Sequence, residues 1–202
     1  MGWRRKLEQD LIAASGYSTA IEMCNDGGPV PNKQVVVIAI QYLKSSVDPH
    51  EGDILLGILR RSPANFDAHP LCEYFDREPR NRWAVAEVMN ASKGKVPCDW
   101  MERTIRDKKF GKDREMLCYA IVKSCPAERA RQALRDVFEE FPGHACKGLG
   151  KVGTREDLDM MLEATTRLTG WQARAIESQG IRPLAKRLGV TIAKEPSRKR
   201  RK

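Results

Sequence analysis

The chain has 202 residues, 41% of them hydrophobic and 31% charged, and a formal net charge of +9 at pH 7. This length allows one compact domain or one short repeat array, and the apolar content is sufficient for a core. A chain of this size does not need disulfides or a metal ion to fold, which excludes the class of small domains held together by such crosslinks.

The cysteine pattern predicts reduced, buried thiols. No two of the six cysteines form a C-x-x-C pair: they are Cys24, Cys72, Cys98, Cys118, Cys125 and Cys146. Cys118 and Cys125 are the closest in sequence, and on one helix they would lie about 10 Å apart along the axis, too far for a disulfide. His144 and Cys146 have no second pair of ligands to complete a tetrahedral metal site. We therefore expect no metal and no cofactor.

The N-terminal sequence and hydropathy predict a soluble intracellular protein. The basic start is followed by Glu8 and Asp10 before any useful apolar run, which is not the pattern of a secretory signal. The longest apolar run, residues 35–40, is too short to cross a bilayer. The expected location is the cytoplasm, or the nucleus if the source is eukaryotic, and the oligomeric state stays open.

Most of the positive charge lies in the last nine residues. Residues 194–202 carry six positive charges and one negative charge, so only +4 of the net charge belongs to the rest of the chain. We expect a disordered tail there, because no apolar residue follows Ala193. Its basic residues are Lys194, Arg198, Lys199, Arg200, Arg201 and Lys202. The tail has three open interpretations: a nuclear import signal, a non-specific anchor for nucleic acid or acidic partners, and a solubilising end.

The N-terminal region predicts a capping helix followed by irregular helical repeats. Trp3, Leu7, Leu11 and Ala14 have helical spacing, so residues 1–26 are expected to form a cap. Residues 25–32 are a turn-and-loop cluster. Residues 34–45 predict a helix, with a strand as the competing interpretation of the β-branched segment 35–38. Residues 52–61 and 70–76 predict two more helices, so that the irregular repeats span 33–79.

From residue 80 to 190 the apolar pattern falls into helix pairs. The predicted pairs are 82–89 with 98–105, 114–123 with 127–141, 146–152 with 155–168, and 171–177 with 183–188. Pro97 and Pro126 precede second helices, which is a start signal. Single pairs could not bury their apolar faces alone, so stacked pairs are the stable arrangement.

Two residue series give the register of these pairs. The second helices carry Ile105, Leu134, Leu162 and Leu188, which are 29, 28 and 26 residues apart. The first helices carry the small residues Ala86, Ala120, Gly148 and Ala175, which are 34, 28 and 27 residues apart. Small side chains are needed where neighbouring helices approach closely.

Two segments resemble HEAT-like, armadillo-type repeats. They are residues 148–154, a Gly-containing turn before Leu158 and Leu162, and residues 83–88, which resemble a first helix. The resemblance implies an all-α fold: a right-handed α-solenoid of antiparallel helix pairs, with the N-terminal helix as its cap. It also implies a scaffold that binds another macromolecule along the surface of its second helices.

No motif for catalysis is found in the sequence. There is no G-x-S-x-G elbow and no glycine-rich phosphate loop, and His50, His69 and His144 are scattered. A HEAT-like di-iron hydroxylase would repeat a His-Glu dipeptide, which occurs here once, at His50. We therefore predict a non-enzymatic protein.

A basic cluster in the central pairs is the main candidate for a macromolecule-binding site. It comprises Arg103, Arg106, Lys108, Lys109, Arg129, Arg131 and Arg135, and we select Arg103, Arg106, Arg131 and Arg135 as site residues. Acidic residues in the third pair interrupt it, namely Glu156, Asp157, Asp159 and Glu163. A continuous groove for phosphates is therefore disfavoured, and a protein is the expected partner.

Two alternatives remain. The first is a nucleic-acid-binding repeat protein that uses the central arginines and the basic tail. The more distant one is a HEAT-like DNA glycosylase, for which Trp83, Trp100 and Asp99 could be nominated. We expect the two tryptophans in the core and Asp99 in the first turn of a helix.

Overall fold

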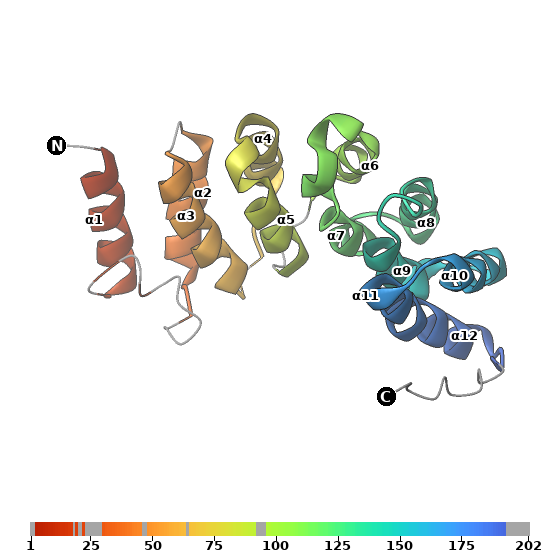
Figure 1. Cartoon of the computed structure of the whole chain (residues 1–202). Helices are drawn as coiled ribbons and strands as arrows, with labels where there is room; N and C mark the ends of the chain where they lie inside the picture. Colours follow the sequence, from red (N-terminus) through yellow and green to blue (C-terminus); the bar gives the residue numbers. More distant parts are fainter. Residues whose placement is uncertain are drawn as a thin grey trace, which may run out of the picture. The chain divides into compact units, whose positions relative to one another are not determined.

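The chain folds into helices that form two compact units. The computed structural model describes residues 3–17, 19, 22, 30–45, 48–63, 65–91 and 96–192. Helices make up the regular structure of these ranges, and they contain no β-strand (Figure 1). Unit 1 is Met1–Pro126 and unit 2 is Ala127–Lys202. The prediction of an all-α fold is confirmed.

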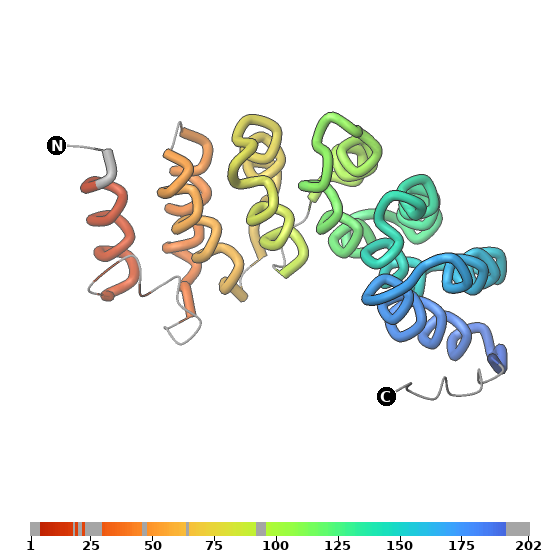
Figure 2. The backbone as a smooth tube through the Cα atoms, in the orientation of Figure 1, coloured from red at the N-terminus to blue at the C-terminus, as the bar shows by residue number. Residues whose placement is uncertain are grey.

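Unit 1 contains seven α-helices and two 3₁₀ segments among its described residues. They are α1 (Trp3–Ser15), α2 (Lys33–Lys44), α3 (Pro49–Arg61), α4 (His69–Arg77), η2 (Pro79–Asn81), α5 (Arg82–Ala91), α6 (Cys98–Arg106), η3 (Lys108–Arg114) and α7 (Leu117–Ser124). Within this unit α2 packs on α1, α3 and α4, α5 packs on α3, α4 and α7, and α6 packs on α7. Figure 2 shows the course of the backbone through these helices.

The α2 segment is a helix, which excludes the competing strand. Asn32 caps it, because its side chain accepts a hydrogen bond of 3.0 Å from the backbone N–H of Val35. Its buried residues follow helical spacing and are Val35, Val36, Ala39 and Leu43. Val37, on the opposite side, is exposed. The N-terminal stripe is also buried at Leu7 and Leu11.

An aromatic cluster forms the core at the C-terminal end of unit 1. Phe75 of α4 meets Trp100 of α6 and Phe110 of η3 edge to face, with ring centroids 5.4 and 5.3 Å apart. The indole N–H of Trp100 donates to the carboxylate of Asp76 at 3.2 Å. Trp100 is thus a core residue, as predicted.

The structure corrects the prediction that Trp83 is buried. Its side chain is 42% exposed. The buried face of α5 consists of Val85, Ala86, Val88 and Met89. Trp83 lies outside this face, since a residue two before Val85 is turned about 200° around the helix axis from it.

Unit 2 consists of α8 (Ala127–Asp136), α9 (Pro142–Val152), α10 (Arg155–Arg167), α11 (Gly170–Ala175), the π-helical segment η4 (Ile176–Ile181) and α12 (Arg182–Leu188). Here α8 packs on α9, and both α9 and α10 pack on η4. Gly153 and Thr154 connect α9 to α10, which confirms the predicted helix–turn–helix at this place. A capping box formed by Thr154 and Asp157 starts α10.

The last predicted helix pair is instead one helical run. No turn separates α11, η4 and α12, because Ile176 and Arg182 both have right-handed helical dihedral angles. Pro183 has no N–H to bond the carbonyl one turn earlier, and the wider π segment precedes it. A proline that starts a helix and one inside a distorted helix look alike in sequence.

Glycine permits close packing of this run on its neighbours. A Cβ atom at Gly180 would lie 2.6 Å from the sulfur of Met161 and 2.9 Å from Cβ of Cys146. A Cβ atom at Gly150 would lie 2.5 Å from the carbonyl oxygen of Gln179. Gly150 thus serves helix packing rather than a turn.

The two register series have different outcomes. Ala86, Ala120, Gly148 and Ala175 are all buried, as predicted for small residues at helix contacts. Ile105 and Leu134 are fully buried, but Leu162 and Leu188 are only half-buried. The buried leucines of α10 and α12 are Leu158 and Leu184, so the register moves by four residues, about one helical turn, in unit 2.

Two predicted helices are shorter than expected. The helix predicted for 114–123 begins at Leu117, because the 3₁₀ segment η3 with its left-handed Gly111 (φ 53°) occupies the preceding residues. The helix predicted for 127–141 ends at Asp136, and residues 137–140 form turns. Among the described helices, none has both the length and the apolar character that a membrane crossing requires.

Candidate macromolecule-binding surface

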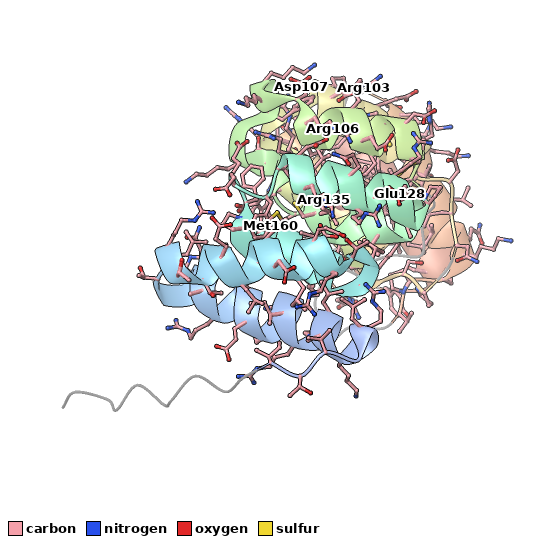
Figure 3. All side chains as sticks on the ribbon, turned by 90° about the vertical axis from the view of Figure 1, so that its right-hand side faces the viewer. Arg103, Arg106, Asp107, Glu128, Arg135 and Met160 are labelled. Atoms are coloured by element: carbon pink, nitrogen blue, oxygen red, sulfur yellow. A yellow bond between two sulfur atoms is a disulfide. The ribbon has the colours of Figure 1, made fainter. Side chains whose placement is uncertain are left out.

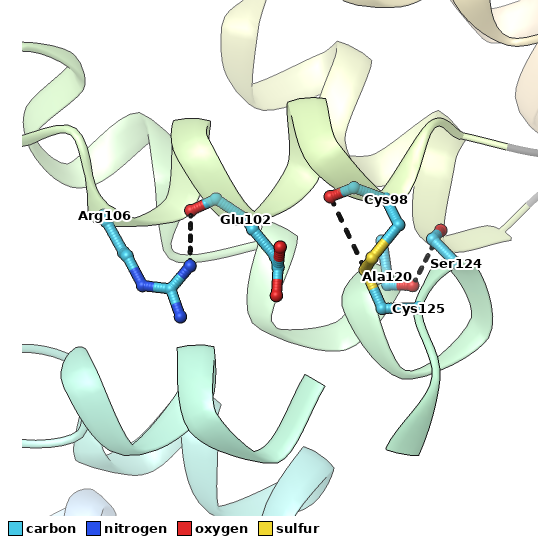
Figure 4. Close-up of a disulfide and its surroundings, with 6 residues drawn as sticks. All are labelled: Cys98, Glu102, Arg106, Ala120, Ser124 and Cys125. Carbon is cyan, nitrogen blue, oxygen red and sulfur yellow. Dashed lines mark hydrogen bonds between the residues drawn. A yellow bond between two sulfur atoms is a disulfide. The ribbon is translucent and has the colours of Figure 1, made fainter. Parts of the chain in front are cut away.

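Arg103 and Arg106 lie on the exposed face of α6. Figure 3 shows both arginines on this helix together with Asp107 at its end. The guanidinium of Arg106 donates to the carbonyl oxygen of Glu102, one turn earlier, at 3.3 Å (Figure 4). No side-chain partner is found for Arg103 in the described part of the chain. The charge of Arg103 is therefore available to a ligand.

The η3 segment extends the positive charge beyond α6. Lys108, Lys109 and Lys112 are exposed. The ammonium of Lys109 lies 3.0 Å from the carboxylate of Asp107. The hydrogen bond that Asp107 accepts from Lys109 lowers the pKa of this carboxyl group. Lys108 and Lys112 have no side-chain partner among the described residues.

A buried arginine holds η3 in place. Arg114 is 1% exposed, and its guanidinium donates to the carbonyl oxygens of Ile105 at 2.8 Å and Gly111 at 3.0 Å. Phe110 points into the aromatic cluster, and the guanidinium of Arg82 stacks on its ring at 4.7 Å from the centroid. These contacts fix both ends of the lysine-rich turn.

In unit 2, Arg135 is engaged in an internal ion pair. Its guanidinium donates to the carboxylate of Asp157, a fully buried residue of α10, and also to the hydroxyl of Thr154 at 3.2 Å. The hydrogen bond with Asp157 raises the pKa of Arg135. Glu156 lies 3.8 Å away and adds a second carboxylate. This charge is balanced within the unit.

Arg131 is likewise paired within unit 2. It forms an ion pair with Glu128, three residues earlier on α8. Figure 3 shows Glu128 and Arg135 on α8 and Met160 on α10. The four selected arginines are thus two sets, Arg103 and Arg106 in unit 1 and Arg131 and Arg135 in unit 2. The tail residues 198–202 lie outside the described residues.

The structure corrects the prediction that all cysteines are reduced. Cys98, the first residue of α6, and Cys125, directly after α7, form a disulfide with Cα atoms 4.9 Å apart (Figure 4). The packing of α6 on α7 brings together two cysteines that are 27 residues apart. Spacing along a single helix, on which the prediction was based, does not show such a contact. The prediction that Cys118 and Cys125 do not pair is confirmed.

Cys72, Cys118 and Cys146 form no disulfide and are buried, as predicted. Burial raises the pKa of Cys72 and of Cys146 to about 12, so both are protonated at neutral pH. Cys24 lies outside the described residues. The disulfide therefore links two segments covalently, whereas the buried thiols contribute to the packing of the core.

The described histidines are separate from one another. His50 and His69 are exposed, and the ring of His144 meets the edge of Trp171 with centroids 5.5 Å apart. No group of three or more His, Cys, Asp or Glu side chains in the described ranges could hold a metal ion. Asp99 lies in the first turn of α6, as predicted.

Sequence reasoning did not select Lys112, Arg114 or Trp171. Trp171 is 52% exposed, and its ring covers Gly143 of α9. Arg114 could have been recognised only as a basic residue next to a glycine turn, because its burial depends on α6. Lys112 follows directly after Lys108-Lys109-Phe110-Gly111, and its place next to these lysines was the sequence signal that could have added it to the basic cluster.

Comparison with models of protein families, with curated proteins and with solved structures found no match for this chain. The class that the structure defines is an all-α protein whose helices pack against one another in a manner compatible with a helical repeat fold.

Proposed function

We propose that the protein is a non-enzymatic scaffold of the HEAT-like, armadillo-type kind, an α-solenoid of antiparallel helix pairs, that binds another protein along its second helices. Each unit is taken by itself: the proposed surface of unit 1 lies on α6, and that of unit 2 lies on α8 and α10. The observation that carries this proposal is the mixed charge of the exposed side chains on these helices.

The mixture favours a protein partner over a nucleic acid. Exposed Asp99 and Arg103 share α6, and exposed Arg155 and Asp159 form an ion pair at 3.3 Å on α10. A surface that follows a phosphate backbone needs successive cations without interleaved carboxylates. Protein surfaces, which carry both signs, complement such a pattern.

The nucleic-acid alternative has less support in unit 2. Arg131 and Arg135 are paired with Glu128 and Asp157, so their charge is already compensated. The glycosylase alternative would need aromatic side chains at the surface; of the two nominated tryptophans, Trp83 is exposed on α5 and Trp100 is buried, so they do not form one aromatic site. The scaffold therefore stands as the preferred function.

Affinity capture from the source cells, followed by reconstitution with the purified partner, tests the proposal. Hydrogen exchange of the reconstituted complex should show protection in α6, α8 or α10. A matched pair of variants adds specificity: Arg103→Glu on α6 should weaken the complex, whereas Lys33→Glu on α2 should not. Protection confined to other helices, or a complex equally weakened by both substitutions, would refute the proposed surface.

A further inference from the structure

Exposed cations are concentrated on α6 and η3, and three of them, Arg103, Lys108 and Lys112, have no side-chain partner among the described residues. Five of the ten residues from 103 to 112 are exposed cations, and we call them the α6–η3 basic patch: Arg103, Arg106, Lys108, Lys109 and Lys112. All five belong to unit 1.

The buried side chain of Arg114 holds the turn that carries the patch in place. Arg114 is buried and donates to the carbonyl oxygens of Ile105 and Gly111, which lie on either side of the lysine pair Lys108–Lys109. Burying a guanidinium is costly unless its donors are bonded, and here two of them fix the turn between α6 and η3. A preorganised turn loses little conformational entropy when a ligand binds to its lysines.

The patch is also short. The nine residues of α6 rise about 14 Å along the axis, and the run of cations ends at Lys112, before Asp113. Asp107 lies within it and compensates Lys109. A ligand with a few separated carboxylates fits this pattern better than a continuous polyphosphate, whose charges would also meet Asp107.

From this geometry we infer that the α6–η3 basic patch binds an acidic segment of the partner protein, with carboxylates facing Arg103, Lys108 and Lys112. The inference rests on the proposed scaffold function and names the chemistry of its partner. An extended acidic segment of about six residues spans roughly 20 Å, enough to follow α6 into η3.

A fluorescent peptide of about ten residues with alternating Glu and Ser is the probe, and the same peptide with Gln in place of Glu is its control. Binding to the full chain is measured by anisotropy at an ionic strength near 0.15 M, where weak non-specific attraction is screened. We expect the Glu peptide to bind and the Gln peptide not to bind. Failure of the wild-type chain to bind the Glu peptide overturns the inference.

Two triple variants locate the site. Arg103→Glu, Lys108→Glu and Lys112→Glu reverse the patch. The matched control reverses three exposed cations elsewhere in unit 1 and consists of Lys33→Glu, Lys44→Glu and Arg80→Glu. Both variants change the net charge equally and keep the basic tail. We expect the patch variant to lose at least about tenfold in affinity and the control less than about threefold.

Equal losses in the two variants would overturn the inference, because they would show an effect of net charge alone. A single-stranded oligonucleotide of equal charge that binds more tightly than the Glu peptide, with the same dependence on the patch, would also overturn it and assign the patch to nucleic acid. Circular dichroism confirms that each variant keeps its helix content.

The inference and the scaffold proposal can fail separately. Hydrogen exchange that maps a partner to α8 and α10, with peptide binding independent of the patch, would overturn only the inference. Patch-dependent peptide binding without any protein partner would establish the acidic chemistry of the ligand of the patch and overturn the scaffold proposal.

Discussion

The two units hold their helices together by different chemistry. Unit 1 links the start of α6 to the end of α7 through the disulfide Cys98–Cys125. Unit 2 links α8 to α10 through Arg135 and the buried carboxylate of Asp157. The difference matters for function, because the ion pair of unit 2 engages an arginine, whereas the disulfide of unit 1 leaves Arg103, Lys108 and Lys112 available to a ligand.

Removal of the disulfide should have the largest effect, and it should be confined to unit 1. Cys98→Ala with Cys125→Ala opens a covalent loop whose ends are 27 residues apart, which is expected to cost about 3.5 kcal/mol of stability. Hydrogen exchange should report faster exchange in α6 and α7 and unchanged exchange in α9 and α10. The same change in both units would contradict a local role of the disulfide.

The difference in burial between Leu134 and Leu188 predicts that their substitution by alanine destabilises the protein to different extents. Leu134 is fully buried in α8, so Leu134→Ala should destabilise the protein by about 3 kcal/mol. Leu188 is half-buried at the end of α12, so Leu188→Ala should cost less than about 1 kcal/mol. Denaturant unfolding measures both, and similar costs would show that Leu188 occupies the core position expected from the sequence period.

The ion pair between Arg135 and the buried Asp157 should contribute more to the free energy of unfolding than an exposed ion pair of unit 2 does. Asp157→Ala removes the partner of Arg135 and the carboxylate that accepts from the N–H of Thr154 at 2.6 Å, and it should cost about 2 kcal/mol. Its matched control, Asp159→Ala, removes the exposed pair with Arg155 and should cost less than about 0.5 kcal/mol. Unfolding free energies of the two variants within error of each other would refute this role of Asp157.

The smallest expected effects concern the stability of the fold at acidic pH. Each unit contains a carboxyl group with a lowered pKa that should contribute to it. The carboxyl pKa is lowered in Asp107 by hydrogen bonds from Lys109, and in Glu156 by hydrogen bonds from the hydroxyl of Thr154 and a backbone N–H. A lowered pKa stabilises the fold above the ordinary pKa of the group, and this contribution is lost as the pH falls through the folded-state value.

Asp107→Asn and Glu156→Gln should therefore each reduce slightly the stability difference between neutral and acidic pH. Titration of the side-chain carboxyls by NMR measures the folded-state pKa directly. Ordinary values for both groups would show that these hydrogen bonds do not persist in solution.

Local patterns predicted most helices, because helix periodicity and capping act over a few residues. Pro97 precedes α6 and Pro126 precedes α8, as their sequence signals indicated. The small residues Ala86, Ala120 and Gly148 are buried at the expected places. These features need no knowledge of the tertiary structure.

The remaining features depend on contacts between distant segments. The disulfide requires α6 to pack on α7, and burial of Asp157 requires Arg135 to reach it from another helix. The uninterrupted run through Pro183 depends on the close approach of Gly180 to Cys146 and Met161. The spacing of residues along the sequence does not reveal any of these contacts. Arg103 and Arg106 are exposed on α6, and their role in binding stays a prediction, whereas spacing along the sequence did not indicate the ion pairs of Arg131 and Arg135.

Amine-reactive labelling of the full chain with and without the Glu peptide tests the central claim most directly, since it compares both units in one sample. The account predicts that the peptide slows the labelling of Lys108 and Lys112 in unit 1 and leaves Lys151 and Lys186 in unit 2 unchanged. Unchanged labelling of Lys108 and Lys112, or equal protection of all four lysines, would contradict it.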